Sequence, residues 1–186
     1  HRAAKALADG RFDDEISPVA RKHGEPVFAD DLLRADTSTE KLAKLRPVFD
    51  RKEGTLTAGN SSGLTDGAGA VLLMSAERAK ALGYTPLAAF RSWSFIGVDP
   101  ADQLLIGPAI AMPRALERAG MELADVGIVE MHEAFAAQVL CVLKALGSPA
   151  FASERLGREG AIGQVDPAKL NPLGGSLALG HPFAAT

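Results

Sequence analysis

The 186-residue sequence has little cysteine, no block of charge of one sign and no long apolar run. Its single cysteine, Cys141, cannot form a disulfide within the chain, which fits a reducing compartment. Its 20 basic and 23 acidic side chains are scattered, so no basic surface is predicted that could neutralise a nucleic-acid backbone. Apolar runs such as Ala70 to Met74 are far short of the roughly 20 residues that a membrane span needs.

These absences argue against a nucleic-acid-binding protein and against a transmembrane protein. We expect a soluble intracellular protein, of the bacterial cytoplasm because the sequence is rich in Ala and Gly, or of mitochondria if the source is eukaryotic. Hydrophobic residues make up 47% of the sequence, which is ordinary for a globular core. The first residues continue a helical pattern closed by Gly10, and "GHPFAAT" starts a helix with Pro182 in its first turn. We therefore expect a piece of a longer chain.

The pattern along the chain divides into three stretches. Residues 1–46 are charged and irregular, with a short helix predicted in "STEKLAKL", capped by its first residues and with its leucines facing inward. In residues 47–84, a small-residue segment leads into the apolar run "AVLLM", which predicts a buried strand, and then into the helical "SAERAKALG". From residue 85 onward, short apolar runs alternate with helical segments. This alternation predicts a layered α/β domain with helices packed on a sheet.

Two histidines follow apolar segments at the start of helices. The strand predicted at 128–131 ends at His132, and His181 is expected to follow a second strand at 176–179. Because ligands usually bind at the carboxyl ends of strands in α/β sheets, the two histidines could share one pocket. The helix after His132 is expected to bury Phe135, Val139, Leu143 and Leu146.

The spacing alone leaves two alternatives for each histidine. Either imidazole can be a cap or a hydrogen-bonded structural residue at a strand–helix junction, or it can be catalytic. A helix N-terminus disfavours a positive charge, so we expect both rings to be neutral, as a general base or a hydrogen-bond donor requires.

Three blocks of the sequence resemble motifs of the thiolase family. The ending "NPLGGSLALGHPFAAT" is similar to the motif in which a GHP histidine follows a pair of glycines, and "HEAFA" is similar to the NEAFA element. "GTLTAGNSSGLTDGAGAVLLMS" matches a third block, and "DGRFDDEI" and "KLRPVF" match as well. The blocks stand in the family's order, so the resemblance extends over nearly the whole chain.

The resemblance implies a thiolase-like layered α/β fold. Thiolases have two similar halves, each with a mixed five-stranded sheet and helices, and a loop domain inserted in the first half. On that map residues 1–46 are the end of the loop domain, residues 47–84 the end of the N-terminal half, and residues 85–186 most of the C-terminal half. The family's nucleophilic cysteine and its acid/base cysteine then lie outside this chain. Cys141 matches neither motif, and we expect it to be a packing residue of low reactivity.

The resemblance also implies catalytic roles for both histidines. His181 would activate the nucleophilic cysteine and donate to the oxyanion hole that holds the thioester oxygen. His132 stands where thiolases usually have an asparagine, which supplies the second polar group of that hole. A directly bonded imidazole would change the part that a water plays there.

Further positions are implied for coenzyme A (CoA) and the acyl chain. Ser62 takes the position that contacts the pantetheine arm, or is a turn hydroxyl, and Phe135 lines the pocket beside the thioester. Arg34 and Lys41 match positions near the adenine nucleotide, or are solvated surface residues. Leu104, with Leu105, falls where the acyl pocket is lined.

The departures from short-chain thiolases resemble the trifunctional β-oxidation type. "HEAFA", "GHPFAAT" and the insertion "ASERLGREGAIGQVDPAKLN" therefore imply a 3-ketoacyl-CoA thiolase, which transfers an acyl group to CoA with release of acetyl-CoA. No metal or redox cofactor is implied, and CoA is a substrate. A homodimer or higher oligomer is expected, alone or with a hydratase/dehydrogenase subunit. The alternatives are a biosynthetic acetyl-CoA acetyltransferase and a non-catalytic acyl-CoA-binding protein. This chain alone is expected to be inactive.

Overall fold

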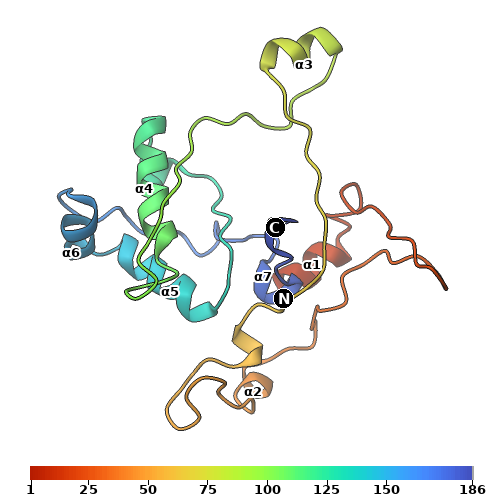
Figure 1. Cartoon of the computed structure of the whole chain (residues 1–186), viewed down its shortest axis with the longest axis horizontal. Helices are drawn as coiled ribbons and strands as arrows, with labels where there is room; N and C mark the ends of the chain where they lie inside the picture. The colour runs from red at the N-terminus through yellow and green to blue at the C-terminus, as the bar shows by residue number, and fades with distance from the viewer. Residues whose placement is uncertain (186) are drawn as a thin grey trace.

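The computed structural model describes residues 1–185 and shows short helices joined by long extended segments (Figure 1). The helices are α1 (Arg2–Ala8), α2 (Thr39–Leu42), α3 (Ala76–Leu82), α4 (Gly107–Ala119), α5 (Ala136–Leu146), α6 (Pro149–Phe151) and α7 (Ser176–Leu179). Single turns are 3-10 at η1 (Ala58–Asn60), η2 (Leu123–Asp125) and η4 (Phe183–Ala185), and a π turn at η3 (Ala152–Leu156) follows α6.

Helix ends follow the predicted capping residues. The Ser38 hydroxyl accepts a backbone N–H from the first turn of α2 at 3.2 Å, and the Ser75 hydroxyl does the same for α3 at 3.2 Å. Gly10, predicted to stop the first helix, has φ +68°, a left-handed conformation that favours glycine after a helix end. The helices predicted around α1, α2, α3, α4 and α5 are therefore confirmed.

The buried core lies around α4 and α5, which pack against each other (Figure 1). Val142 and Leu146 of α5 are both fully buried. The other buried members lie in α4 and α5, just before α4, and in the segments that follow both helices, namely Ile106, Ala109, Ile110, Leu123, Val129, Met131, Val139, Ala145, Ala152 and Ile162. This cluster holds the C-terminal part of the chain together by apolar burial.

Two expectations for α5 need correction. Val139 and Leu146 are buried as predicted, whereas Phe135 and Leu143 are only half-buried. Cys141, expected to pack, is exposed. Because buried positions on a helix recur every three to four residues, the stripe through Val139 and Leu146 leaves Cys141 off the core face.

The expected strands are not formed as regular strands within residues 1–185. Isolated β-bridges replace them, with Val129 parallel to Leu170 in the predicted strand 128–131. Residues 70–74, expected to be a buried strand, are extended but make no backbone hydrogen bond within the described chain, and Val71 is 84% exposed. A strand needs a neighbouring backbone to pair with, and the apolar run alone does not provide one.

The predicted strand at 176–179 is a helix instead. The N–H groups of Leu179 and Gly180 bond the carbonyls of Gly175 and Ser176, at 3.1 and 2.9 Å, which closes the short helix α7. The Glu133 carboxylate accepts the N–H of Leu177 at 3.1 Å and satisfies a donor of the first turn. A run of four apolar or small residues is too short to distinguish the periodicity of a strand from that of a helix. Here the capping contacts favour the helix.

We call residues 70–97 the arm. Figure 1 shows it leaving the region of α1 and α7, reaching α3 at its tip and returning toward α4. It is tied to α4 where Ser92 Oγ donates to the carbonyl of Ala115 at 2.6 Å. Most of its large apolar side chains are exposed, in contrast to the burial expected for its apolar runs: Val71, Leu72, Leu73, Leu82, Tyr84, Leu87, Phe90, Trp93 and Phe95.

The N-terminal stretch is surface-like, as its composition predicts, but Leu45 of the predicted inward face is 40% exposed. Leu42 and Leu45 lie against Gly59, where a Cβ would come within 2.4 Å of Leu42 Cδ2.

In the described part of the chain, no single helix is long and apolar enough to cross a membrane. α5 together with residues 149–156 satisfies the length and composition only as a pair bent by 87°.

Candidate functional site

The structure brings the two predicted histidines into contact. The ring centres of His132 and His181 are 3.7 Å apart, with an angle of 31° between the ring planes. His132 follows the segment that bridges to Leu170, and His181 follows α7, so residues from distant parts of the sequence form one pair. Phe183 stands beside it, with its ring centre 5.0 Å from that of His181. The catalytic roles stay a prediction.

Residues 57–67, the small-residue segment, lie beside both histidine segments. The His181 N–H donates to the carbonyl of Gly63 at 3.1 Å, and the Ser62 N–H donates to the carbonyl of Ala134 at 2.9 Å. Bridges of Ser61 to Phe135 and of Leu64 to His181 continue these contacts. The three motif blocks of the sequence therefore meet at one place.

Glycine is required where these segments touch. Gly180 has φ +87°, and a Cβ there would come within 2.4 Å of Thr65 Cγ2. A Cβ on Gly67 would come within 2.7 Å of Pro182 Cγ. Because no other residue leaves room for such backbone approach, the glycines of two separate motifs are explained by one contact surface.

Asn171 and Glu133, which the sequence analysis did not single out, hold the segments in place. Asn171 is 3% exposed, and its side chain accepts from the Met131 N–H at 2.7 Å and donates to the Met131 carbonyl at 2.9 Å. The same amide group donates to Glu133 Oε1 at 2.7 Å, and Glu133 Oε2 accepts from Leu177. Both residues lie inside the quoted motifs. A polar residue at such a junction between segments was the feature of the sequence that could have indicated their role.

Helix α1 supports the same segment from its other side. Arg2 of α1 donates to the carbonyls of Leu170 and Pro167, the latter at 2.7 Å. A Cβ on Gly174 would come within 2.5 Å of the Ala3 Cβ, so α1 packs closely on the pair of glycines. The first residues of the chain therefore help to position the loop before α7.

Ser176 provides the hydrogen-bond partner of His132. Its Oγ lies 2.7 Å from His132 Nδ1 and 3.4 Å from the Glu133 backbone N, and Ser176 is 6% exposed. The His132 ring itself keeps an open side toward solvent. The sequence analysis missed this serine, although it stands in the quoted terminal motif.

The environment lowers the pKa of His132 below its ordinary value of 6.5. Partial desolvation of the ring is the largest cause, the neighbouring His181 adds to it, and Glu133 acts in the opposite direction. The lowered pKa favours the neutral ring expected from the sequence, with desolvation as the main cause. Paired neutral imidazoles can supply one proton acceptor and one N–H donor to the same ligand.

Ser62 and Phe135 lie next to the segments that carry the histidine pair, and their roles toward CoA and the thioester stay a prediction. Ser62 is half-buried, and its Oγ donates to the carbonyl of Gly63 at 3.3 Å. Phe135 precedes α5, and its ring packs edge-on against Phe49 with ring centres 6.2 Å apart. Both residues are thus held beside the pair by neighbouring segments.

Arg34 and Lys41 are exposed residues of the N-terminal stretch. Lys41 Nζ lies 2.5 Å from Asp36 Oδ2 and 2.8 Å from the Asp36 carbonyl, and it lowers the pKa of that carboxyl. An exposed pair of this kind contributes little and can open for another anion.

Leu104 lies in the turn before α4 and is 59% exposed, with Leu105 beside it. It lies in a different segment from the ring contact and the hydrogen bond described above for the histidine pair.

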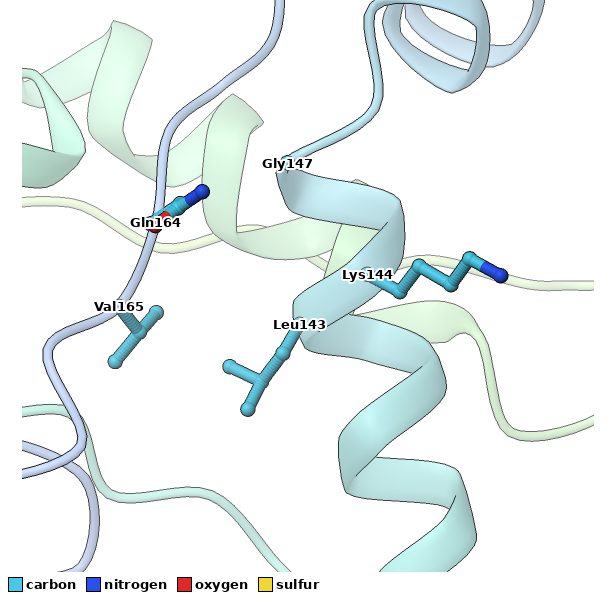
Figure 2. Close-up of a pocket in the computed structure, with 5 residues that line it drawn as sticks. All are labelled: Leu143, Lys144, Gly147, Gln164 and Val165. Atoms are coloured by element: carbon cyan, nitrogen blue, oxygen red, sulfur yellow. The ribbon is translucent and has the colours of Figure 1, made fainter.

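A pocket of about 390 Å³ between α5 and residues 164–165 contains none of these residues (Figure 2). Leu143, Lys144 and Gly147 line one side, and Gln164 and Val165 line the other (Figure 2). Among residues 1–185 no cluster of three or more His, Cys, Asp or Glu side chains could hold a metal ion.

Known proteins match the chain over its whole length. Residues 1–77 match the family model "Thiolase, N-terminal domain", and residues 84–186 match "Thiolase, C-terminal domain". The 3-ketoacyl-CoA thiolase of Citrobacter koseri is 52% identical over 186 residues, which are 100% of this chain and 43% of that protein. The chain thus spans less than half the length of this relative.

Solved structures have the same fold. The acetyl-CoA acetyltransferase of Bacillus anthracis superposes with a TM-score of 0.83 and 40% identity, over 100% of this chain and 43% of its own. Human mitochondrial 3-ketoacyl-CoA thiolase in complex with CoA superposes with a TM-score of 0.82 and 40% identity, over 97% of this chain and 41% of its own. The predicted fold class is confirmed by these likenesses.

Proposed function

This chain belongs to the thiolase family, and on that premise we propose that it carries the histidine part of an acyl-transfer site. The complete protein, meaning the longer chain that we expect to contain this sequence, cleaves a 3-ketoacyl-CoA with CoA. Acetyl-CoA leaves, and the shortened acyl group passes through a cysteine thioester to CoA. The relative from Citrobacter koseri, named 3-ketoacyl-CoA thiolase, supports this choice of substrate.

The contact between His132 and His181 is the observation that carries the proposal. Two charged imidazoles with centres 3.7 Å apart would repel each other, so at least one ring stays neutral. His181 takes the proton of the nucleophilic thiol, which makes the thiolate that attacks the 3-keto carbon. His132 donates to the thioester oxygen, which becomes negative as the bond to the leaving acetyl-CoA breaks, and a positioned donor has a large effect there.

The substrate's CoA part is proposed to follow the small-residue segment. Ser62 lies between the histidine segments and would contact the pantetheine arm, and Phe135 would line the space beside the thioester. Arg34 and Lys41 would meet the nucleotide phosphates, with Lys41 leaving Asp36 to do so. The human relative solved with CoA supports this ligand. Leu104 is proposed for the acyl pocket only in the complete protein.

We further propose three segments for this chain: the end of the loop domain at residues 1–46, the end of the N-terminal half at residues 47–84, and most of the C-terminal half at residues 85–186. We also propose a bacterial cytoplasmic enzyme that assembles as a homodimer or higher oligomer, alone or with a hydratase/dehydrogenase subunit. CoA serves as a substrate, and no metal or redox cofactor is proposed.

A biosynthetic acetyl-CoA acetyltransferase is the second candidate function. The likeness to the Bacillus anthracis acetyl-CoA acetyltransferase supports it, at the same identity as the human thiolase. The two functions differ in acyl chain and direction, because the same covalent chemistry runs both ways. Comparing turnover of acetoacetyl-CoA with that of a long 3-ketoacyl-CoA distinguishes them.

The test is CoA-dependent cleavage of a 3-ketoacyl-CoA. We expect turnover by the complete protein and none by residues 1–186 alone, because the nucleophile is proposed to lie outside them. Steady turnover by the purified 186-residue chain would contradict the proposal. Acyl-CoA binding without turnover by the complete protein would favour a non-catalytic binding protein.

A further inference from the structure

Ser176 lies where it can determine which nitrogen of the His132 ring carries the proton. It is the first residue of α7, is 6% exposed, and its hydroxyl contacts the ring of His132 at 2.7 Å. We propose that Ser176 is a positioning residue that holds His132 as the neutral tautomer with its proton on Nε2. The consequence for turnover rests on the proposed function, whereas the tautomer itself does not.

The direction of the hydrogen bond follows from the neighbours of the hydroxyl. Two groups of the described chain lie within hydrogen-bond distance of Ser176 Oγ, the Glu133 N–H at 3.4 Å and His132 Nδ1 at 2.7 Å. The Glu133 N–H can only donate, so it occupies a lone pair of the oxygen. The hydroxyl proton therefore goes to Nδ1, since a buried hydroxyl whose proton has no acceptor is destabilising.

This assignment fixes the second nitrogen of the ring. A neutral imidazole carries one proton, so an Nδ1 that accepts from Ser176 leaves the proton on Nε2. The face of the ring is covered by His181 at 3.7 Å, so the ring is held both by its Nδ1 edge and by its face. Nε2–H is then presented as a donor, which is what an oxyanion position requires.

The backbone keeps the serine in place. The Leu177 N–H is bonded to the Glu133 carboxylate, and Gly180 N–H closes the helix onto the Ser176 carbonyl at 2.9 Å. A Cβ on Gly175 would come within 2.5 Å of Glu133 Oε2, so the start of α7 lies directly on the segment that carries His132. These contacts therefore join the segments of Ser176 and His132 directly and hold the hydroxyl beside the ring.

A double-mutant cycle in the complete protein tests the dependence on His132. Ser176→Ala should lower kcat by about 3- to 10-fold with KM unchanged, the effect of one lost hydrogen bond. In a His132→Ala background the same substitution should change kcat by less than about 2-fold, because no ring remains to be oriented. Ser148→Ala, which removes the cap hydroxyl of α6, is the matched control and should leave kcat unchanged in both backgrounds.

An equal loss in both backgrounds would show that Ser176 acts on the fold and not through His132, and an unchanged kcat in the parent would also overturn the proposal. The nitrogen-15 resonances of His132, assigned by their absence in His132→Asn, give a second measurement that needs no turnover. We expect a protonated Nε2 in the parent at pH 8 and some protonated Nδ1 in Ser176→Ala.

The two measurements separate the two proposals. A proton on Nδ1 in the parent overturns the role of Ser176 even if the enzyme is active. A proton on Nε2 in a complete protein that lacks thiolase turnover refutes the proposed function and leaves the assignment of Ser176 standing.

Discussion

The two halves of the sequence block "GTLTAGNSSGLTDGAGAVLLMS" differ in how they are held in the structure. Residues 57–67 are bonded to both histidine segments, whereas residues 70–74 begin the arm and expose their apolar side chains. The first half is fixed by backbone hydrogen bonds and glycine contacts, which two neighbouring segments can supply. The second half needs a large apolar surface beside it, and no segment among residues 1–185 provides one. Small residues therefore indicate which segments pack closely against them. An apolar run indicates only that some apolar surface must cover it.

His181→Ala is expected to have the largest effect on turnover. It tests the region where residues 57–67 are bonded to the histidine segments. In the complete protein the loss of the proposed general base should lower kcat by about 10² to 10⁴ without changing the melting temperature. Lys80→Ala, in the helix of the arm, is the control and should keep the parent turnover. Near-normal turnover and near-normal alkylation of the catalytic thiol in His181→Ala would make this histidine a structural residue.

A pair of leucines compares the core with the arm directly. In the 186-residue chain Leu146→Ala should lower the free energy of unfolding by about 2–5 kcal/mol, because Leu146 is fully buried. Leu72→Ala should change it by less than about 0.5 kcal/mol, because Leu72 is 72% exposed. Thermal and denaturant unfolding measure both.

The same leucine in the complete protein sharpens that comparison. There Leu72→Ala should approach the cost of Leu146→Ala if the arm becomes the buried strand that its sequence predicts. The chain alone should also associate through its exposed apolar side chains, as sedimentation can show. A chain that stays monomeric on sedimentation, or equal costs for the two leucines in the chain alone, would contradict the contrast drawn between core and arm.

His132 variants test the second histidine. His132→Ala in the complete protein should lower turnover by roughly 10², the usual effect of losing an oxyanion donor, whereas His132→Asn should retain much of it because asparagine is the usual residue in thiolases. Turnover at fixed pH decides between them. Equal activity of the two variants would leave His132 with a structural role only.

The smallest expected effect is on the pH dependence of stability. Because the folded protein lowers the pKa of His132, the unfolded chain binds the proton more readily. The contribution is therefore complete above the ordinary value of 6.5, and stability decreases as the pH falls below it. His132→Asn should remove this slope, measured by unfolding between pH 5 and 8. A slope of the same size in that variant would assign it to other groups.

The sequence predicted the features that depend on neighbouring residues. The cap at Ser38, the stop at Gly10 and the burial of Val139 and Leu146 all follow from local spacing. The motifs also predicted that the two histidines lie together, although the segment before His181 is a helix and not the predicted strand. Local pattern was sufficient for these.

It failed where a partner segment decides the outcome. The run 176–179 forms a helix because Glu133 caps it, and residues 70–74 stay unpaired because no described backbone lies beside them. Asn171 and Ser176 were missed for the same reason, since their roles depend on Met131 and His132 in a distant segment. Such contacts have no signature in local spacing.

The meeting of three distant segments at the histidine pair has a consequence for folding kinetics. Contacts between α4 and α5 close a short loop, whereas those of Ser62, His132 and His181 close long ones and cannot form before the chain has been brought together. We expect the helical hairpin to fold first and the histidine pair to be a late event. Stopped-flow refolding should then show helix formation in a faster phase than the recovery of catalytic competence.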